Sequence, residues 1–162
     1  DYLEISASRA LQVLCLMELE DFETAEAILE DRLRVHQQDA RLVSMLAYIH
    51  QQTGREREAI RLHRRVLELE PDNVNSLNSL GYLLTVYGAP ADRAEAFRCL
   101  KEAITLRPDH PAYLDSFGVF LAKSGEKERA RKALMKALRA DPENGEILEH
   151  IKNLLGDEDF SD

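Results

Sequence analysis

Residues 111–144 read PAYLDSFGVFLAKSGEKERARKALMKALRADPEN, and residues 40–73 read ARLVSMLAYIHQQTGREREAIRLHRRVLELEPDN. Both stretches are 34 residues long, and they place small residues, large apolar residues and a late proline at the same positions. The stretch between them, residues 74–110, has 37 residues and repeats the same pattern. A period near 34 residues is typical of repeating helix–turn–helix units.

Each shared residue type has a physical role in such a unit. A small residue in the first helix lets the second helix approach closely, and an alanine in the second helix does the same from the other side. The large residues then form an apolar stripe between the helices. A proline ends the second helix, since it cannot continue the hydrogen-bond ladder. The three sets, in chain order, are Ala47, Gly81 and Gly118; Ala59, Ala96 and Ala130; and Pro71, Pro108 and Pro142.

Together these units resemble the tetratricopeptide repeat (TPR) family over about residues 20–155. The resemblance implies an all-α fold, a right-handed α-solenoid of stacked helix pairs with a concave binding surface. We expect one TPR domain over residues 1–156, followed by an acidic tail at 157–162. Within it we expect a degenerate first repeat (about 3–39), full repeats (40–73, 74–110 and 111–144) and a capping helix (145–156). The last two full repeats resemble those of bacterial TPR proteins.

The two ends of the array depart from the repeat pattern. The first unit lacks the Leu-Gly pair, and its apolar stripe is expected at Ala10, Leu11, Leu14 and Cys15. Such a unit either ends the array or packs on a further repeat. Because the chain begins at Asp1, we interpret it as a processed or excised fragment. In the capping helix, Leu148, Ile151 and Leu155 are expected to be buried.

The helices implied by this register and by the Gly/Pro punctuation span 3–18, 22–36, 40–52, 56–69, 74–87, 93–106, 111–123, 127–139 and 145–155.

Charge and composition narrow the class of partner. The formal net charge is −9, which disfavours nucleic acid and anionic membranes and allows a basic or neutral polypeptide. Solvated helix faces are the simpler explanation of the acidity. No apolar run approaches the ~18 residues of a membrane span. We expect Cys15 and Cys99 to be reduced core residues, which favours the cytoplasm over the periplasm or an envelope anchor.

No phosphate-binding loop, zinc signature or nucleophile motif is present. We therefore expect no enzyme activity, no cofactor and no metal. His50 and His63 are expected to face each other within one repeat. Two imidazoles there could bind a metal or form a pH-sensitive contact, but a third ligand is not evident. The other interpretation is that both rings pack where aromatic side chains usually lie.

In TPR folds the first helix of each pair lines the concave groove, and the resemblance carries this role to particular positions here. Asparagine can pair with both the N–H and C=O of an extended peptide, and tyrosine offers flat apolar area with a hydroxyl. The alternative is a solvated face with tyrosine contacts between repeats. The candidate partner-binding residues are Arg41, Ser44, Tyr48, Asn75, Asn78, Tyr82 and Asp115.

We expect a non-catalytic interaction module, an adaptor or scaffold whose groove holds a peptide or helix of another protein. The cationic clamp of chaperone-binding TPRs is absent, because its slots hold Ser44, Tyr48, Ser79, Ala112 and Ser116. The alternative is a structural or self-associating segment of a longer TPR array, which the degenerate first repeat favours. Enzyme activity is a distant third, since only the His50/His63 pair suggests it.

Overall fold

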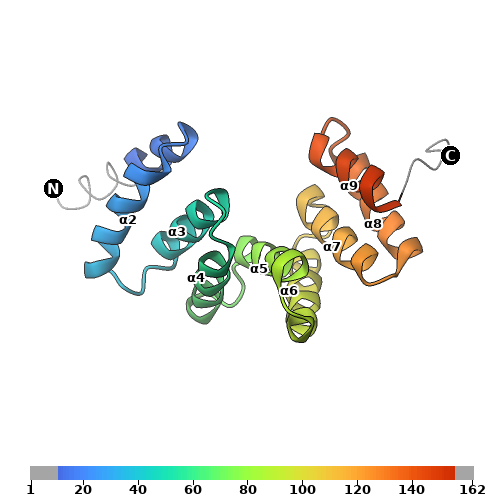
Figure 1. Cartoon of the computed structure of the whole chain (residues 1–162), viewed down its shortest axis with the longest axis horizontal. Coiled ribbons are helices and arrows are strands. Elements are labelled where there is room, and N and C mark those ends of the chain that lie inside the picture. Colours follow the sequence, from blue (N-terminus) through green and yellow to red (C-terminus); the bar gives the residue numbers. More distant parts are fainter. Residues whose placement is uncertain (1–10, 156–162) are drawn as a thin grey trace. The chain divides into compact units, whose positions relative to one another are not determined.

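The computed structural model describes residues 11–155, and the described residues form helices joined by short connections, with no β-strand among them (Figure 1). The all-α fold class is confirmed. Residues 11–18 are helical; the rest of the helix predicted over 3–18, and the tail at 157–162, lie outside the described residues. The other helices are α2 (Phe22–Val35), α3 (Ala40–Gln52), α4 (Glu56–Leu69), α5 (Val74–Tyr87), the 3-10 turn η1 (Pro90–Asp92), α6 (Arg93–Leu106), α7 (Pro111–Lys123), α8 (Lys127–Ala140) and α9 (Gly145–Leu155).

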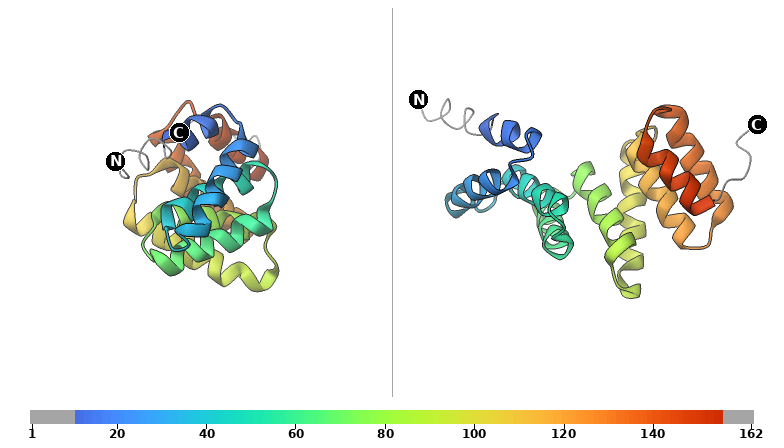
Figure 2. Two further views of the ribbon diagram at one scale, coloured as in Figure 1. Left: turned by 90° about the vertical axis from the view of Figure 1, so that its left-hand side faces the viewer. Right: turned by 45° about the horizontal axis from the view of Figure 1, so that its top comes forward.

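The chain divides into two compact units, Asp1–Pro71 and Asp72–Asp162. In the first unit α2 packs on α3, and α3 pairs with α4. In the second unit α5 pairs with α6 and α7 with α8, while α9 packs on both α7 and α8 (Figures 1 and 2). The expectation of a single domain over residues 1–156 stays a prediction.

Two glycines fix how closely the helices of a pair approach. A Cβ added to Gly81 of α5 would lie 2.5 Å from Cγ of Leu100 on α6. A Cβ added to Gly118 of α7 would lie 2.6 Å from Cγ of Leu134 on α8. Carbon atoms pack at about 3.5–4.0 Å, so only glycine fits at either position. The predicted role of the small residues is therefore confirmed in both pairs.

Local sequence explains where the helices begin and turn. The side chains of Asp21, Asp39 and Asn73 accept hydrogen bonds from backbone N–H groups in the first turns of α2, α3 and α5, which satisfies donors that a helix start leaves free. Gly54 and Gly125 turn the chain between the helices of a pair with φ of +70° and +80°, a region that other residues rarely adopt.

The helix α9 covers the end of the second unit. Ile147 and Ile151 are 1% and 2% exposed, and they pack with Leu114, Leu134 and Ala137 of α7 and α8. The prediction for Ile151 is confirmed, but that for Leu148 is wrong, because Leu148 is 46% exposed. The apolar stripe runs from Ile147 through Ile151 at i+4 to Leu155 at i+8, which is half-buried, and Leu148 is rotated about 100° away from it.

The helix at residues 11–18 shows a similar rotation. Val13 is buried in the core of the first unit with Ala25 and Leu29 of α2. Leu11, Leu14 and Cys15 are exposed instead. The expectation that Cys15 is a core residue is wrong, because two residues of helix separate it from Val13 by about 200°. Cys99, by contrast, is buried, and both cysteines are free.

Candidate functional site

Three of the predicted partner-binding residues form a row on α5 of the second unit. Asn75, Asn78 and Tyr82 are spaced three and four residues apart and therefore share one helix face. Asn75 is exposed, while Asn78 and Tyr82 are half-buried. Oδ1 of Asn75 accepts a hydrogen bond of 2.6 Å from the Tyr113 hydroxyl of α7. Oδ1 of Asn78 is buried and has no hydrogen-bond donor among the residues of 11–155.

The structure places Asp115 of α7 beside α9. Its side chain is buried, and Oδ2 lies 2.8 Å from Nδ1 of His150. The other oxygen, Oδ1, is buried with no hydrogen-bond donor in the described part of the chain. The hydrogen bond to Asp115 raises the pKa of His150 in spite of its partial burial. Asp115, expected to set the direction of a partner by its charge, is thus paired within the protein.

Tyr82 connects this pair to α5. Its ring centroid lies 6.3 Å from that of His150. Burial raises the pKa of Tyr82, and the nearby carboxylates of Glu146 and Asp115 add to the rise. The helices α5, α7 and α9 therefore contribute side chains to one surface, which we call the α5–α7–α9 face, made of Asn75, Asn78, Tyr82, Asp115, Glu146 and His150.

Sequence reasoning missed the contribution of α9. His150 is the sixth residue of α9 and Glu146 the second, and in the full repeats these are two of the positions predicted to face the groove. Applying the repeat register to the capping helix would have found both residues. The contact between His150 and Asp115 spans 35 residues of sequence, so no local sequence pattern predicts it.

The other predicted residues lie on α3 of the first unit. Arg41, Ser44 and Tyr48 again have three- and four-residue spacing. Arg41 is exposed, Ser44 is half-buried and Tyr48 is 44% exposed. This row forms a face of the first unit that we call the α3 face.

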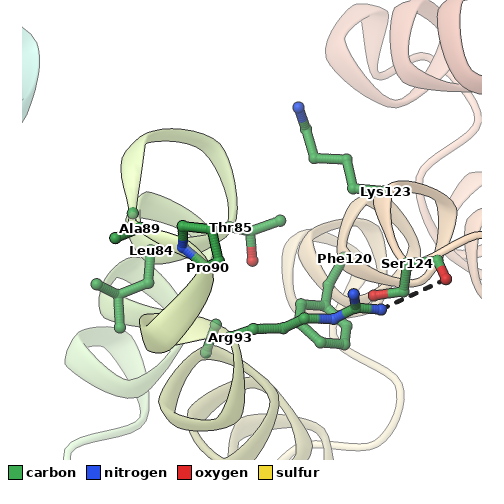
Figure 3. A pocket seen from close by; sticks show the side chains of 10 residues that line it. Leu84, Thr85, Ala89, Pro90, Arg93, Phe120, Lys123 and Ser124 are labelled. Atoms are coloured by element: carbon green, nitrogen blue, oxygen red, sulfur yellow. Dashed lines mark hydrogen bonds between the residues drawn. The ribbon is translucent and has the colours of Figure 1, made fainter.

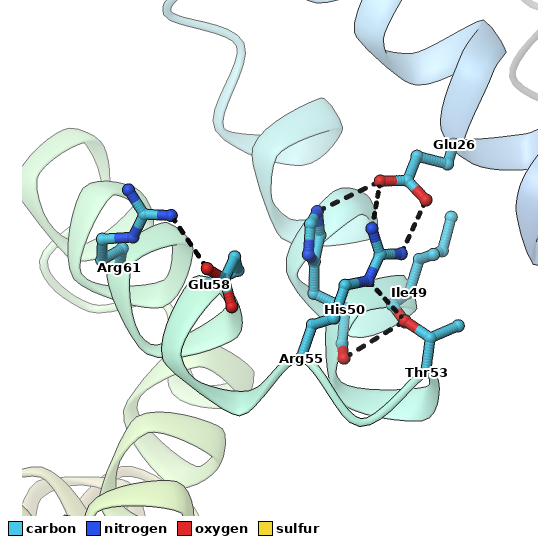
Figure 4. Close-up of polar contacts among 7 residues, drawn as sticks. All are labelled: Glu26, Ile49, His50, Thr53, Arg55, Glu58 and Arg61. Atoms are coloured by element: carbon cyan, nitrogen blue, oxygen red, sulfur yellow. Dashed lines mark hydrogen bonds and ion pairs between the residues drawn. The ribbon is translucent and has the colours of Figure 1, made fainter.

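His50 and His63 of the first unit have different neighbours. Nε2 of His50 is 3.4 Å from Oε1 of Glu26 on α2. The Arg55 guanidinium donates to both oxygens of Glu26, at 2.7 and 2.6 Å (Figure 4). This hydrogen bonding lowers the pKa of Glu26, and burial, with the charge of Arg55, lowers the pKa of His50. The cluster ties α2 to the turn after α3, which is a packing role.

His63 of α4 is 3% exposed, and burial lowers its pKa from 6.5 to about 4. A histidine that is this deeply buried is neutral at physiological pH. Within the described range no group of three His, Cys, Asp or Glu side chains could hold a metal ion.

The repeat pairs can now be compared with known proteins. Residues 40–73 and 113–144 match the model of the tetratricopeptide repeat. The chain contains tetratricopeptide repeats at these two segments. The matched TPR segments contain α3 with α4 and most of α7 with α8, and the segment between them carries the three additional residues. No curated protein sequence matches the chain.

Several solved structures share the fold. MamA 41-end from Desulfovibrio magneticus RS-1 has 17% identity and a TM-score of 0.75, covering 90% of this chain and 80% of its own. YrrB, described as a TPR protein with an unusual peptide-binding site, has 22% identity and a TM-score of 0.72, covering 88% and 71%. PilW, described as a widely conserved type IV pilus biogenesis factor, has 21% identity and a TM-score of 0.79, covering 94% and 70%.

A TPR fold is a protein–protein interaction module, and the family is generally non-catalytic. Its partners are proteins. Among the described helices, none has the length and apolar composition that crossing a membrane requires.

Proposed function

We propose that this TPR protein is a non-catalytic adaptor that binds a peptide or helix of a partner protein, and that the α5–α7–α9 face of the second unit is a principal contact surface. YrrB is described as having an unusual peptide-binding site, which makes peptides the first partner class to test. The α3 face of the first unit, with Tyr48 as its exposed aromatic residue, is a further candidate contact surface.

The observation that carries this proposal is the pair of buried oxygens on neighbouring helices. Asn78 Oδ1 and Asp115 Oδ1 have no hydrogen-bond donor in the described range. A buried acceptor without a donor costs roughly 1–3 kcal/mol. These oxygens are closed off from the surface, so rotation of the two side chains on binding would turn them toward backbone N–H groups of the polypeptide. The half-buried ring of Tyr82 would provide apolar contact area.

The acidic residues on the α5–α7–α9 face favour a partner segment that is basic or neutral. Glu146 lies close enough to Tyr82 to affect its pKa, and Asp115 is held by His150. The predicted opposition of Arg41 and Asp115 in setting the direction of the partner is not carried into the proposal, because Asp115 is paired with His150 and Arg41 lies on the other unit. Affinity on the order of micromolar is expected, because a peptide loses conformational entropy when it is ordered.

The test is selection of binders from a random peptide library on the intact protein. Selected peptides should lose at least about tenfold in affinity when Asn78→Ala and Tyr82→Ala are combined, since tyrosines often dominate interface energetics. Tyr48→Ala alone measures the α3 face. Tyr87→Ala is the matched control, because this exposed tyrosine of the same helix lies about 140° around it from Tyr82.

Isothermal titration should be accompanied by thermal unfolding, so that loss of binding is separated from loss of fold. The proposal would be contradicted if the double variant, folded as the parent, bound the selected peptides with unchanged affinity. It would also be contradicted if Tyr87→Ala alone abolished binding.

A second function, self-association or packing within a longer TPR array, is favoured by one specific observation. Leu11, Leu14 and Leu19 are 62%, 50% and 77% exposed, although the core of the first unit is filled by Val13 and its neighbours. Leu11 and Leu14 share one side of their helix, and exposed apolar stripes of this kind often mark interaction surfaces.

Solution mass over a concentration series decides this second function. A mass that rises with concentration, and that returns to the monomer value in the variant Leu11→Ser with Leu14→Ser, supports self-association through this stripe. A monomeric parent at every concentration excludes self-association through this stripe.

A further inference from the structure

A cleft of about 340 Å³ lies at the connection between α5 and α6, where it meets the end of α7 (Figure 3). None of the residues of the α5–α7–α9 face lines it. Its walls are formed mainly by Leu84, Ala89, Pro90 and Phe120, and its charged groups are Arg93 and Lys123. An adjoining hollow of about 450 Å³ shares Pro90, Arg93, Phe120 and Ser124 with it and adds Phe97.

The longer connection of this repeat builds the cleft. Residues 88–92 join α5 to α6, whereas residues 53–55 and 124–126 suffice in the other two pairs. Gly88 allows this path, because a Cβ there would collide with the carbonyl oxygen of Leu84. Asp92 then fixes the turn by accepting a hydrogen bond of 2.8 Å from the Ala89 N–H.

The charges of the cleft have one sign. No Asp or Glu is among the residues that line it. The Arg93 guanidinium lies 6.0 Å from the centre of the Phe120 ring, and one of its N–H groups donates to the Ser124 carbonyl at 3.4 Å. Guanidinium has five donors and ammonium three, so Arg93 and Lys123 retain donors for an anion. Figure 3 shows the Lys123 side chain reaching away from the helix beside this site.

The apolar wall of the cleft is formed by aromatic rings that pack against one another. The ring of Phe120 is buried, and its centroid lies 5.7 Å from that of Phe97 and 6.5 Å from that of Phe117. Arg93 thus lies beside an aromatic ring, which attracts the cation, and its side chain remains exposed to a partner. A carboxylate that contacts it there forms a charge-assisted hydrogen bond, which is stronger than a neutral one.

The adjoining hollow also contains Glu126, whose carboxylate is paired with Arg129. The charge of Arg129 offsets that of Glu126. The positive charge of Arg93 on the wall shared by the two hollows is therefore retained.

We propose that this cleft is a second docking site, which takes an acidic segment of a partner polypeptide. A carboxylate side chain of the partner pairs with Arg93 and Lys123, and a neighbouring apolar side chain enters the hollow against Pro90 and Phe120. The site is separate from the α5–α7–α9 face and prefers the opposite charge in its ligand, so a single partner with both segments, or two partners, could be held at once.

Fluorescence polarisation with labelled synthetic peptides tests the proposal on the full chain at physiological ionic strength. The peptide GEEFEG carries both features, GQQFQG removes the carboxylates, and GEEAEG removes the aromatic ring. We expect GEEFEG to bind, and each of the other two to bind at least about tenfold more weakly. Arg93→Gln combined with Lys123→Gln should weaken GEEFEG by a similar factor.

Arg131→Gln with Lys132→Gln is the matched control, because it removes the same charge from exposed positions of α8 and should leave GEEFEG binding unchanged. Tyr82→Ala should also leave it unchanged, which separates this site from the proposed function above. Thermal unfolding verifies that each variant is folded.

Three outcomes would overturn the proposal. Equal loss in the α8 control would mean that the attraction is diffuse and belongs to no site. Equal binding of GQQFQG or GEEAEG would remove the acidic or the apolar half of the recognition. Complete displacement of GEEFEG by inorganic phosphate at equimolar concentration would assign the cleft to small free anions.

Discussion

At the scale of single residues, Gly81 decides how close α5 and α6 can lie. Adding a methyl group there forces Leu100, a fully buried residue, out of its position. Overpacking of this kind costs roughly 1–3 kcal/mol, and the better helix propensity of alanine recovers only about 1 kcal/mol. We therefore expect Gly81→Ala to lower the free energy of unfolding, measured by urea denaturation.

Gly145→Ala provides the control for that substitution. Nothing lies within 4 Å of a Cβ added to Gly145, so its stability should be unchanged or slightly higher. If Gly81→Ala matched the parent in stability, the close approach of α5 and α6 would not be a constraint on the fold.

His63 predicts a pH dependence of stability. Because its pKa falls from 6.5 to about 4 on folding, the unfolded chain takes up a proton at this residue before the folded chain does. Stability should therefore be lost as the pH falls from 6.5 to 4, by on the order of 3 kcal/mol from this residue. His63→Phe should flatten the profile of unfolding free energy over this range.

An exposed histidine, His36, supplies the comparison. The substitution His36→Gln should leave the profile of the parent in place. A His63→Phe profile as steep as that of the parent would assign the acid sensitivity to other groups, of which the Glu26–His50–Arg55 cluster is the first candidate.

At the scale of elements, the capping role of α9 depends on which side of the helix is apolar. Ile147→Ala should cost roughly 2–5 kcal/mol, since it leaves a cavity beside Leu134 and Ala137. Leu148→Ala, one position along, removes an exposed side chain and should change the unfolding free energy by less than about 0.5 kcal/mol. Similar costs for both would mean that the helix is rotated from the position described.

Helix boundaries were predictable from sequence because their signals are local. The bounds of α3, α4, α5, α6, α7 and α9 agree with the prediction, and α2 and α8 each differ by one residue. Glycine, proline and capping side chains lie next to the ends that they determine, so a repeat register transfers them from one pair to the next.

The rotation of the terminal helices was less predictable, for a physical reason. Leu148 lies next to Ile147, and Cys15 lies two positions from Val13. In each case the second residue is buried instead, so two stripes compete in the sequence. A central helix has neighbours on several sides, which restricts the choice, whereas a terminal helix has fewer. The link from Asp115 to His150 was missed because it depends on tertiary packing alone.

At the scale of the whole molecule, the charge is unevenly placed. The chain carries a net charge of −9, yet α8 reads KERARKALMKALRA, with six Lys or Arg residues and one Glu. Phosphate contacts supply most of the affinity of proteins for DNA, and a net negative chain repels the duplex as a whole. We expect no binding of double-stranded DNA at physiological salt in a gel-shift measurement.

Retention of DNA at that salt concentration, lost on Arg131→Glu, would contradict this expectation and assign α8 a role in nucleic-acid binding. Arg131 and its neighbour Lys132 are both exposed, so the substitution Arg131→Glu tests charge without disturbing the core.

The contrast between the two cysteines gives the molecule a built-in reporter for spectroscopy. Cys15 is exposed in the first unit, whereas Cys99 is buried in the second, where burial also raises the pKa of its thiol. A maleimide dye should label the folded chain once, at Cys15, without any engineered cysteine. Uptake of a second dye would then report opening of the second unit. The number of labels per chain, followed by mass spectrometry over time, would therefore measure the rate at which this unit unfolds.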